Sequence, residues 1–195
     1  MVRLRHHGPR SSPRRRACAA LFGALALPAG GAFAADLSPD AMFVQLGAGR
    51  ATDTAAIGLN WLWPRQWHWA GGELSGYWEL SLGRWASPNA RGGDAAWVSQ
   101  FGITPVLRWR PSDEPRTWFV EAGMGANVVS PLYRNRRESF STVFNFGDHL
   151  AVGRNFGADG AHEVALRIQH FSNAGLSEPN PGANFVQLRY AYTFR

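Results

Sequence analysis

Apolar and polar side chains alternate along eight separate segments of the chain, and this period of two constrains its fold more than any other feature. The last segment places Val186, Leu188, Tyr190, Tyr192 and Phe194 at every second position, with polar and small residues between them. Successive side chains of a β-strand point to opposite faces, so each such segment has one apolar and one polar face. The pattern predicts an all-β protein.

The predicted strands are separated by clusters of Gly, Pro, Asn, Asp and Ser, which are typical of turns. They cover residues 41–50, 53–63, 73–86, 97–110, 116–129, 141–156, 161–173 and 184–194. Compact connections at 64–72, 111–115 and 157–160 alternate with wider ones at 87–96, 130–140 and 174–183, although the first link, at 51–52, is short. Short periplasmic turns and longer outer loops are expected of a barrel with both termini in the periplasm.

A soluble β-sandwich and a membrane barrel both produce this alternation, and the aromatic residues favour the barrel. The chain has nine Trp, and most of them flank the predicted connections, as interfacial aromatic girdles do. These are Trp61, Trp63, Trp67, Trp69, Trp85, Trp97, Trp109 and Trp118. Polar-face residues, including Arg167 and Arg189, would fill a narrow lumen. We therefore predict an eight-stranded antiparallel transmembrane β-barrel of the outer-membrane type.

Residues 1–34 have the three parts of a secretory signal peptide. Six arginines lie in the first sixteen residues, an apolar run covers residues 17–28, and Ala32 and Ala34 form a small-residue site before Ala35. The apolar run is shorter than the roughly 18 residues that a membrane-spanning helix needs. We expect a signal peptide at 1–34 and the barrel at 35–195.

Composition excludes several classes of function. The formal net charge of +6 comes from the leader, because the rest of the chain has 14 Arg and 14 Asp+Glu, so no nucleic-acid partner is indicated. Cys18, the only cysteine, also lies in the leader, which leaves no thiol for chemistry in the mature chain. No Walker loop, dinucleotide fingerprint or HExxH pair occurs, and the histidines are scattered. We expect neither a metal nor a cofactor.

The residues between 169 and 190 carry the candidate chemistry. His170 and Ser172 are two apart on a predicted strand, so their side chains share a face, and the histidine can accept the proton of the hydroxyl. That face also carries Val164, Leu166 and Ile168, so the pair is expected to point toward lipid near the extracellular rim. The loop that follows can offer amide donors to an oxyanion.

The run His170-Phe171-Ser172-Asn173-Ala174-Gly175-Leu176, followed by Pro179-Asn180-Pro181-Gly182 and Arg189-Tyr190, resembles the signature of the lipid A 3-O-deacylase family (PagL). Members of that family are eight-stranded outer-membrane barrels. The resemblance implies that Ser172 is the nucleophile, that His170 is the general base, and that Asn173 and Asn180 lie near the oxyanion. It also implies the acyl ester at the 3 position of lipid A as the substrate.

The third catalytic member departs from the family pattern. The Glu that orients the histidine in the family falls, by spacing from Ser172, at Asn184. An amide can orient an imidazole but cannot supply the negative charge that stabilises imidazolium. Asp148 is an alternative, because a register that closes over residues 157–161 would set it opposite His170, and Glu178 in the adjoining loop is another.

These observations predict an outer-membrane serine esterase whose partners are lipid A or lipopolysaccharide and the lipids of that membrane. A homodimer is left open. Two other functions also stay open at this point. One is a non-catalytic small barrel, structural or lipopolysaccharide-binding, with a decayed active site at Asn184. The other is transfer of the acyl chain to a second acceptor.

Overall fold

The structure, a computed structural model, describes residues 37–88, 95–112, 117–135 and 139–194. The predicted signal peptide, residues 1–34, lies outside these ranges. The strands are β1 (Ala41–Gly49), β2 (Thr52–Leu62), β3 (Trp67–Trp69), β4 (Gly72–Ser87), β5 (Ala96–Pro111), β6 (Trp118–Ser130), β7 (Phe144–Phe156), β8 (His162–Ser172) and β9 (Ala183–Thr193). A helix of sufficient length and apolar character to traverse a membrane does not occur in the described ranges.

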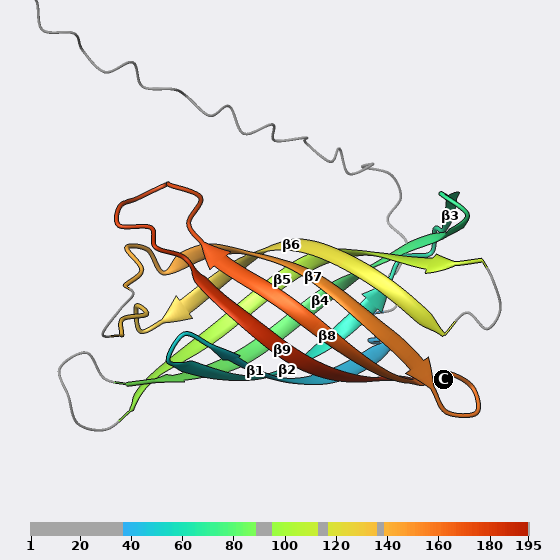
Figure 1. The fold of residues 1–195 in the computed structure, drawn as a ribbon, viewed down its shortest axis with the longest axis horizontal. Helices are drawn as coiled ribbons and strands as arrows, with labels where there is room; N and C mark the ends of the chain where they lie inside the picture. Colours follow the sequence, from blue (N-terminus) through green and yellow to red (C-terminus); the bar gives the residue numbers. More distant parts are fainter. Residues whose placement is uncertain (1–36, 89–94, 113–116, 136–138, 195) are drawn as a thin grey trace, which may run out of the picture. The chain divides into compact units, whose positions relative to one another are not determined.

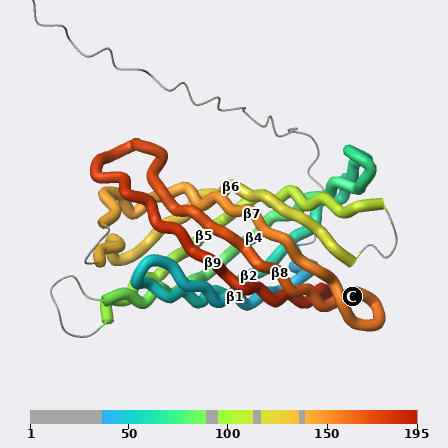
Figure 2. The backbone as a smooth tube through the Cα atoms, viewed as in Figure 1, coloured from blue at the N-terminus to red at the C-terminus, as the bar shows by residue number. Residues whose placement is uncertain are grey.

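Eight of the strands form a closed antiparallel barrel, which confirms the predicted fold (Figure 1). Sequential neighbours pair along the chain, β9 pairs with β1, and a β2–β4 pairing completes the cylinder. The short strand β3 pairs with the start of β4 and was not predicted, because its three residues lie within the segment 64–72 that was assigned to a compact connection. The connections β6–β7 and β8–β9 lie at one end of the barrel, opposite the β7–β8 turn (Figure 2).

Strand boundaries agree with the prediction within a few residues, with β7 as the largest difference. The prediction begins this strand at residue 141, whereas β7 begins at Phe144. The hydroxyls of Ser141 and Thr142 donate to the backbone oxygens of Ser177 and Phe144, at 3.0 and 2.6 Å. Local bonds of this kind compete with a strand ladder, so these residues belong to the preceding connection.

The outer surface of the barrel is apolar. In β8, Val164, Leu166 and Ile168 are 39%, 52% and 62% exposed, and they alternate with buried residues. A soluble sandwich would bury such a face between two sheets, whereas a bilayer covers the outer face of a barrel. The alternation therefore reflects a membrane barrel with its apolar face outward.

Paired charges fill the lumen. Arg167 and Arg189 are fully buried, and both donate to the carboxylate of Glu79, at distances of 2.8 to 3.0 Å. Arg167 also reaches Glu121, which in turn accepts from Arg108 at 2.7 Å. Buried charges are tolerated only when paired and hydrogen-bonded. This network explains why polar residues occupy the inward face of the strands. The sequence predicted such lumen positions for Arg167 and Arg189.

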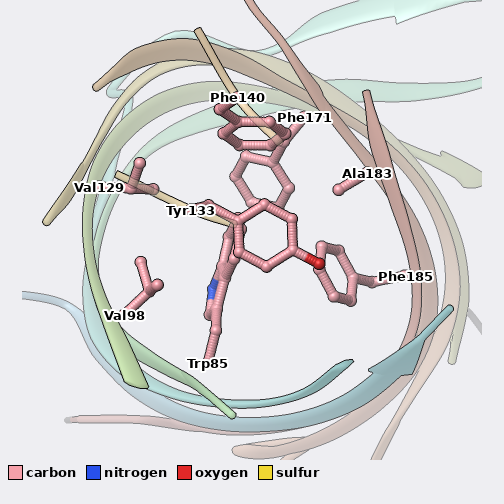
Figure 3. Packing of buried hydrophobic residues seen from close by; sticks show 8 residues of the cluster. All are labelled: Trp85, Val98, Val129, Tyr133, Phe140, Phe171, Ala183 and Phe185. Carbon is pink, nitrogen blue, oxygen red and sulfur yellow. The ribbon is translucent and has the colours of Figure 1, made fainter. Parts of the chain in front are cut away.

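An aromatic cluster closes the lumen below the outer loops (Figure 3). Trp85 lies at its centre, with ring centroids 4.9 Å from Phe171, 5.0 Å from Phe185 and 5.3 Å from Tyr133. Tyr133 reaches down from the β6–β7 connection, and its hydroxyl hydrogen-bonds Thr52 Oγ1 at 2.7 Å. The cluster thus joins a loop to the strands beneath it.

The predicted aromatic girdle holds for several tryptophans but not for Trp85. Trp67, Trp69, Trp97 and Trp118 are between 39% and 65% exposed near strand ends. Trp85 is only 2% exposed, because its position in β4 has the same parity as lumen-facing residues such as Tyr77 and Glu79. Its place near a loop is therefore not sufficient to make it interfacial.

Candidate active site

His170 and Ser172 lie at the end of β8 and face outward, in line with the exposed residues Leu166 and Ile168. Both side chains are half-buried. Phe171 between them points inward and is 3% exposed in the aromatic cluster. Packing of this ring fixes the backbone between the two polar residues, so the strand presents both of them on the lipid-facing surface.

The register of the neighbouring strands places polar residues on both sides of His170. Asp148 of β7 lies directly opposite His170, and Asn184 of β9 lies opposite it on the other side. Side chains of directly opposed residues have Cβ atoms about 4.5–5.5 Å apart. The predicted pairing of Asp148 with His170 is present, and Asn184 also faces outward.

The imidazole of His170 is oriented by Asn184. Its Nδ1 lies 2.7 Å from Asn184 Oδ1, an oxygen that can only accept a hydrogen bond. Nδ1 therefore carries the hydrogen, and Nε2 of the neutral ring has the lone pair that a general base needs. No hydrogen bond joins the ring to Ser172 among the described residues. Such bonds are often long in the absence of substrate and shorten when it binds.

Gly182 lies against the other edge of the ring. A Cβ atom at this position would lie 2.5 Å from Cε1 and 3.2 Å from Nε2 of His170. The backbone here also has a positive φ of 69°, which glycine adopts without strain. The absence of a side chain at Gly182 thus makes room for the Cε1–Nε2 edge of the His170 ring, while Asn184 binds Nδ1.

We expect Gly182→Ala to lower the kcat of the ester hydrolysis that the family resemblance implies, roughly tenfold or more. Displacing a catalytic group by about 1 Å costs up to about 10²-fold in rate. The matched control is Gly175→Ala, since Gly175 has a φ of 80° in the same loop but open space around its Cα. Steady-state rates of both variants check the prediction. Equal losses would assign the effect to backbone strain and not to the position of the ring.

Asn173 does not present its side chain to the outer surface. It is 1% exposed, and its Nδ2 donates to Ser141 Oγ at 2.9 Å and to Ser177 O at 2.8 Å. Its Oδ1 accepts from Gly175 N at 2.9 Å. These bonds link the β6–β7 and β8–β9 connections. Ser141 has this role without any signal in the sequence, because the contact joins two loops 32 residues apart.

Asn180 has an available amide donor. Its Oδ1 accepts from the backbone N of Asn173 at 3.1 Å, so the side chain is fixed beside the end of β8. Its Nδ2 donates to no acceptor among the described residues. Asn173 thereby positions Asn180, and of the two side chains predicted near an oxyanion it is Asn180 that has a donor to offer.

The two remaining candidates for the third member differ in their surroundings. Glu178 accepts from the backbone N of Asn180 at 3.1 Å in the exposed loop, and no hydrogen bond or ion pair connects it with His170 in the described part of the chain. Asp148 is half-buried on the outer face between Met124 and His170. Its carboxylate is the acidic group that the register sets beside the imidazole.

An apolar hollow of about 480 Å³ lies on the outer face just below these residues. Leu150 and Ile168, which line it, are the next outward-facing pair below Asp148 and His170. Ala122 on β6 opposes Leu150, and its small side chain adds to the depth of the hollow. An acyl chain whose ester lies at Ser172 could extend along this surface and stay in an apolar environment.

This arrangement fits acyl transfer through a serine. A hydroxyl, an imidazole with its tautomer fixed and an amide donor are grouped within one strand end and one loop, which are the parts that nucleophilic catalysis on an ester needs. Asn in place of an acid as the partner of the histidine also occurs in Cys-His-Asn enzymes. The group faces the bilayer, so its substrate must be reached from the membrane.

Comparison with known proteins gives consistent matches. A family model described as lipid A 3-O-deacylase (PagL) matches residues 55–193, a span that includes β8 and β9. A lipid A deacylase PagL of Bordetella bronchiseptica is 36% identical over 134 residues, which cover 68% of this chain and 70% of that protein. A lipid A deacylase PagL of Pseudomonas aeruginosa is 31% identical over 144 residues, with 73% and 79% covered. A crystal structure of the outer membrane enzyme PagL superposes with a TM-score of 0.67 and 27% identity, over 79% of this chain and 99% of that chain.

Proposed function

Because this chain belongs to the lipid A 3-O-deacylase (PagL) family, we propose that it is a serine esterase that removes the 3-linked 3-hydroxyacyl chain of lipid A. It is an outer-membrane protein and a hydrolase that acts on lipid A, since its relatives are lipid A deacylases and its structural neighbour is an outer-membrane enzyme. Lipid A, as part of lipopolysaccharide, is therefore its substrate. The ester class of the reaction and the residues that carry it are the proposal.

In the proposed reaction Ser172 Oγ attacks the carbonyl carbon of the ester while its proton passes to Nε2 of His170. The carbonyl oxygen becomes an oxyanion, for which Asn180 Nδ2 is the available donor. The bond to the sugar oxygen then breaks, and that oxygen leaves as an alcohol with the proton from Nε2. Water then attacks the carbonyl carbon of the acyl-serine and gives a proton to Nε2 of His170. The bond to Ser172 Oγ breaks, Nε2 returns the proton to that oxygen, and the fatty acid is released.

The observation that carries this proposal is the hydrogen bond between His170 Nδ1 and Asn184 Oδ1 on the lipid-facing surface. It fixes Nε2 as the basic nitrogen, two residues from a hydroxyl on the same face. The apolar hollow below supports the same reading, because an acyl chain in it would extend toward the membrane interior from an ester at Ser172. Asp148 would stabilise the imidazolium that forms, by charge and without a hydrogen bond.

Incubation of the purified barrel with lipopolysaccharide, followed by mass spectrometry of the lipid, tests the proposal. The expected products are lipid A that is lighter by one 3-hydroxyacyl chain and one equivalent of free 3-hydroxy fatty acid. Unchanged lipid A from folded protein would favour the non-catalytic barrel in which Asn184 marks a decayed site. Loss of the chain with its recovery on a second lipid would instead indicate acyl transfer.

A further inference from the structure

A second polar group lies on the apolar outer surface, on the opposite side of the barrel from His170. Arg84 of β4 faces outward, and its Nη1 donates to Ser99 Oγ of β5 at 2.6 Å. Around the eight barrel strands, β4 is separated from β8 by four steps in either direction. This group is therefore independent of the candidate active site.

The position of Arg84 along the barrel axis follows from the strand register, because residues that are directly opposed on neighbouring strands form a row across the outer face. The next outward-facing row toward the middle of the barrel is Ile57, Leu82 and Phe101, which are 59%, 55% and 47% exposed. Arg84 is thus the first charge above a continuous apolar row, and Trp97 lies next to it with the guanidinium 5.7 Å from its ring centroid. A Trp and an Arg at such a boundary are typical of the level of lipid headgroups.

Arg84 is at the same end of the barrel as His170. Because antiparallel neighbours alternate in direction, two strands separated by four steps run the same way, and Ser87 and Ser172 end β4 and β8. Arg84 and the candidate active site therefore contact the same leaflet. If the proposed function holds, that leaflet contains lipid A.

The guanidinium of Arg84 is available to an anion. Its partners in the described residues are a neutral hydroxyl and an aromatic ring. Asp53 faces outward on β2, opposite Ala86 near the same rim, but no ion pair joins these two described residues, Asp53 and Arg84. An arginine fork with free N–H donors binds phosphate oxygens in a bidentate way.

An apolar hollow of about 580 Å³ lies directly beside this cation. Its base is Ala55, which opposes Arg84 on one side and Leu46 on the other. Leu46, Ile57 and Leu82 form its walls, and their larger side chains leave a depression over the small one. A cation at headgroup height above an apolar depression matches a lipid with an anionic headgroup and an acyl chain.

We propose that Arg84 and the hollow over Ala55 bind a second molecule of phosphorylated lipid A, with a phosphate at the guanidinium and one acyl chain in the hollow. The assignment to lipid A rests on the proposed function, because that function places this lipid in the leaflet that both sites contact. No histidine is among the described residues that line this hollow, so Ser99 has no general base there and the site holds the lipid without turnover. It gives the barrel a fixed annular lipid on the face away from Ser172.

Native mass spectrometry of the full barrel in detergent with added diphosphorylated lipid A tests the proposal. The parent protein is Ser172→Ala, so that the lipid is not consumed. We expect two bound lipid A molecules, and an affinity for one of them that falls about tenfold or more in Arg84→Gln, since a charge-assisted pair is lost. Ala55→Phe, which fills the hollow and keeps the charge, should remove the same molecule.

Arg154→Gln is the matched control. Arg154 also lies over an exposed tryptophan, Trp118, at 5.6 Å from the ring centroid, but at the opposite end of the barrel. This variant should keep both lipids. Heat-dependent migration on a denaturing gel verifies that every variant is folded.

Several results would overturn the proposal. They are unchanged binding in both Arg84→Gln and Ala55→Phe, equal binding of dephosphorylated lipid A, and equal losses in Arg84→Gln and Arg154→Gln. Conversion of a dimer to a monomer by Arg84→Gln, with the lipid count unchanged, would assign the hollow to a second copy of the chain. Failure of the proposed function is distinguishable. In that case no lipid A would bind beside Ser172, and the one bound lipid that remains would be lost in Arg84→Gln.

Discussion

Replacing Ser172 with alanine is expected to lower the rate of lipid A deacylation by about 10⁴-fold or more while the barrel stays folded. Loss of a catalytic serine removes the covalent route, and what remains comes from binding and from the oxyanion donor. The side chain is half-buried on the outer face and contributes nothing to the lumen network, so its loss should not affect folding. Single-turnover measurement of released 3-hydroxy fatty acid gives the rate.

Ser130→Ala is the control for this variant. Ser130 is also an outward-facing serine at the last position of a strand, β6, which runs toward the same end of the barrel as β8. It is remote from His170. Its removal should leave the rate within about twofold of the parent, as expected for surface substitutions. If Ser172→Ala retained the full rate of chain loss, another nucleophile or a contaminating enzyme would have to be responsible, and the assignment would be rejected.

Replacing Asp148 with asparagine is expected to lower kcat by roughly 10². Directly opposed residues have Cβ atoms about 4.5–5.5 Å apart. Unit charges at about that separation interact by about 3 kcal/mol at an effective dielectric constant of about 20, which corresponds to about 10² in rate. Asp148 lies opposite His170 across the β7–β8 pair, so its carboxylate is expected to stabilise the imidazolium of the proposed reaction. The change keeps the shape of the side chain, removes its charge and replaces one acceptor oxygen with an NH2 donor. The kcat of the purified variant measures the effect.

Asn184→Ala separates orientation from charge. It removes the hydrogen bond to Nδ1, which frees the ring to turn, so kcat should also fall. In the double variant Asp148→Asn with Asn184→Glu, a carboxylate is supplied from the other side of the ring, and we expect most of the rate to return. Asp53→Asn, at an outward-facing aspartate on β2, is the matched control without an expected effect.

The outcome of this set decides which residue replaces the family's Glu. Loss of activity in Asp148→Asn but not in Asn184→Ala would make Asp148 the functional acid and Asn184 dispensable. The reverse would show that an amide alone is sufficient to orient the histidine. Full activity in both single variants would contradict the whole account of the third member.

The position of Trp85 shows where the sequence was informative and where it was not. Period-two alternation is local, so it determined the eight strands and the face on which each residue lies, including the lumen positions of Arg167 and Arg189. Parity along β4 places Trp85 on the inward face with Tyr77 and Glu79, but it does not show what covers the ring. Trp85 is only 2% exposed because Tyr133 and Phe140 fold down from the β6–β7 connection and pack against it.

The same division applies to the candidate site. The spacing of His170 and Ser172 alone determined that they share the outer face, because a strand repeats every two residues. The neighbours of His170 depend on how β7 and β9 align with β8. A slip of two residues would keep Asp148 and Asn184 on the outer face but move them away from His170. Side-chain polarity does not encode that alignment uniquely. Closure of the barrel decided it, since every strand must pair on both sides, and that closure placed an amide and a carboxylate on either side of one imidazole.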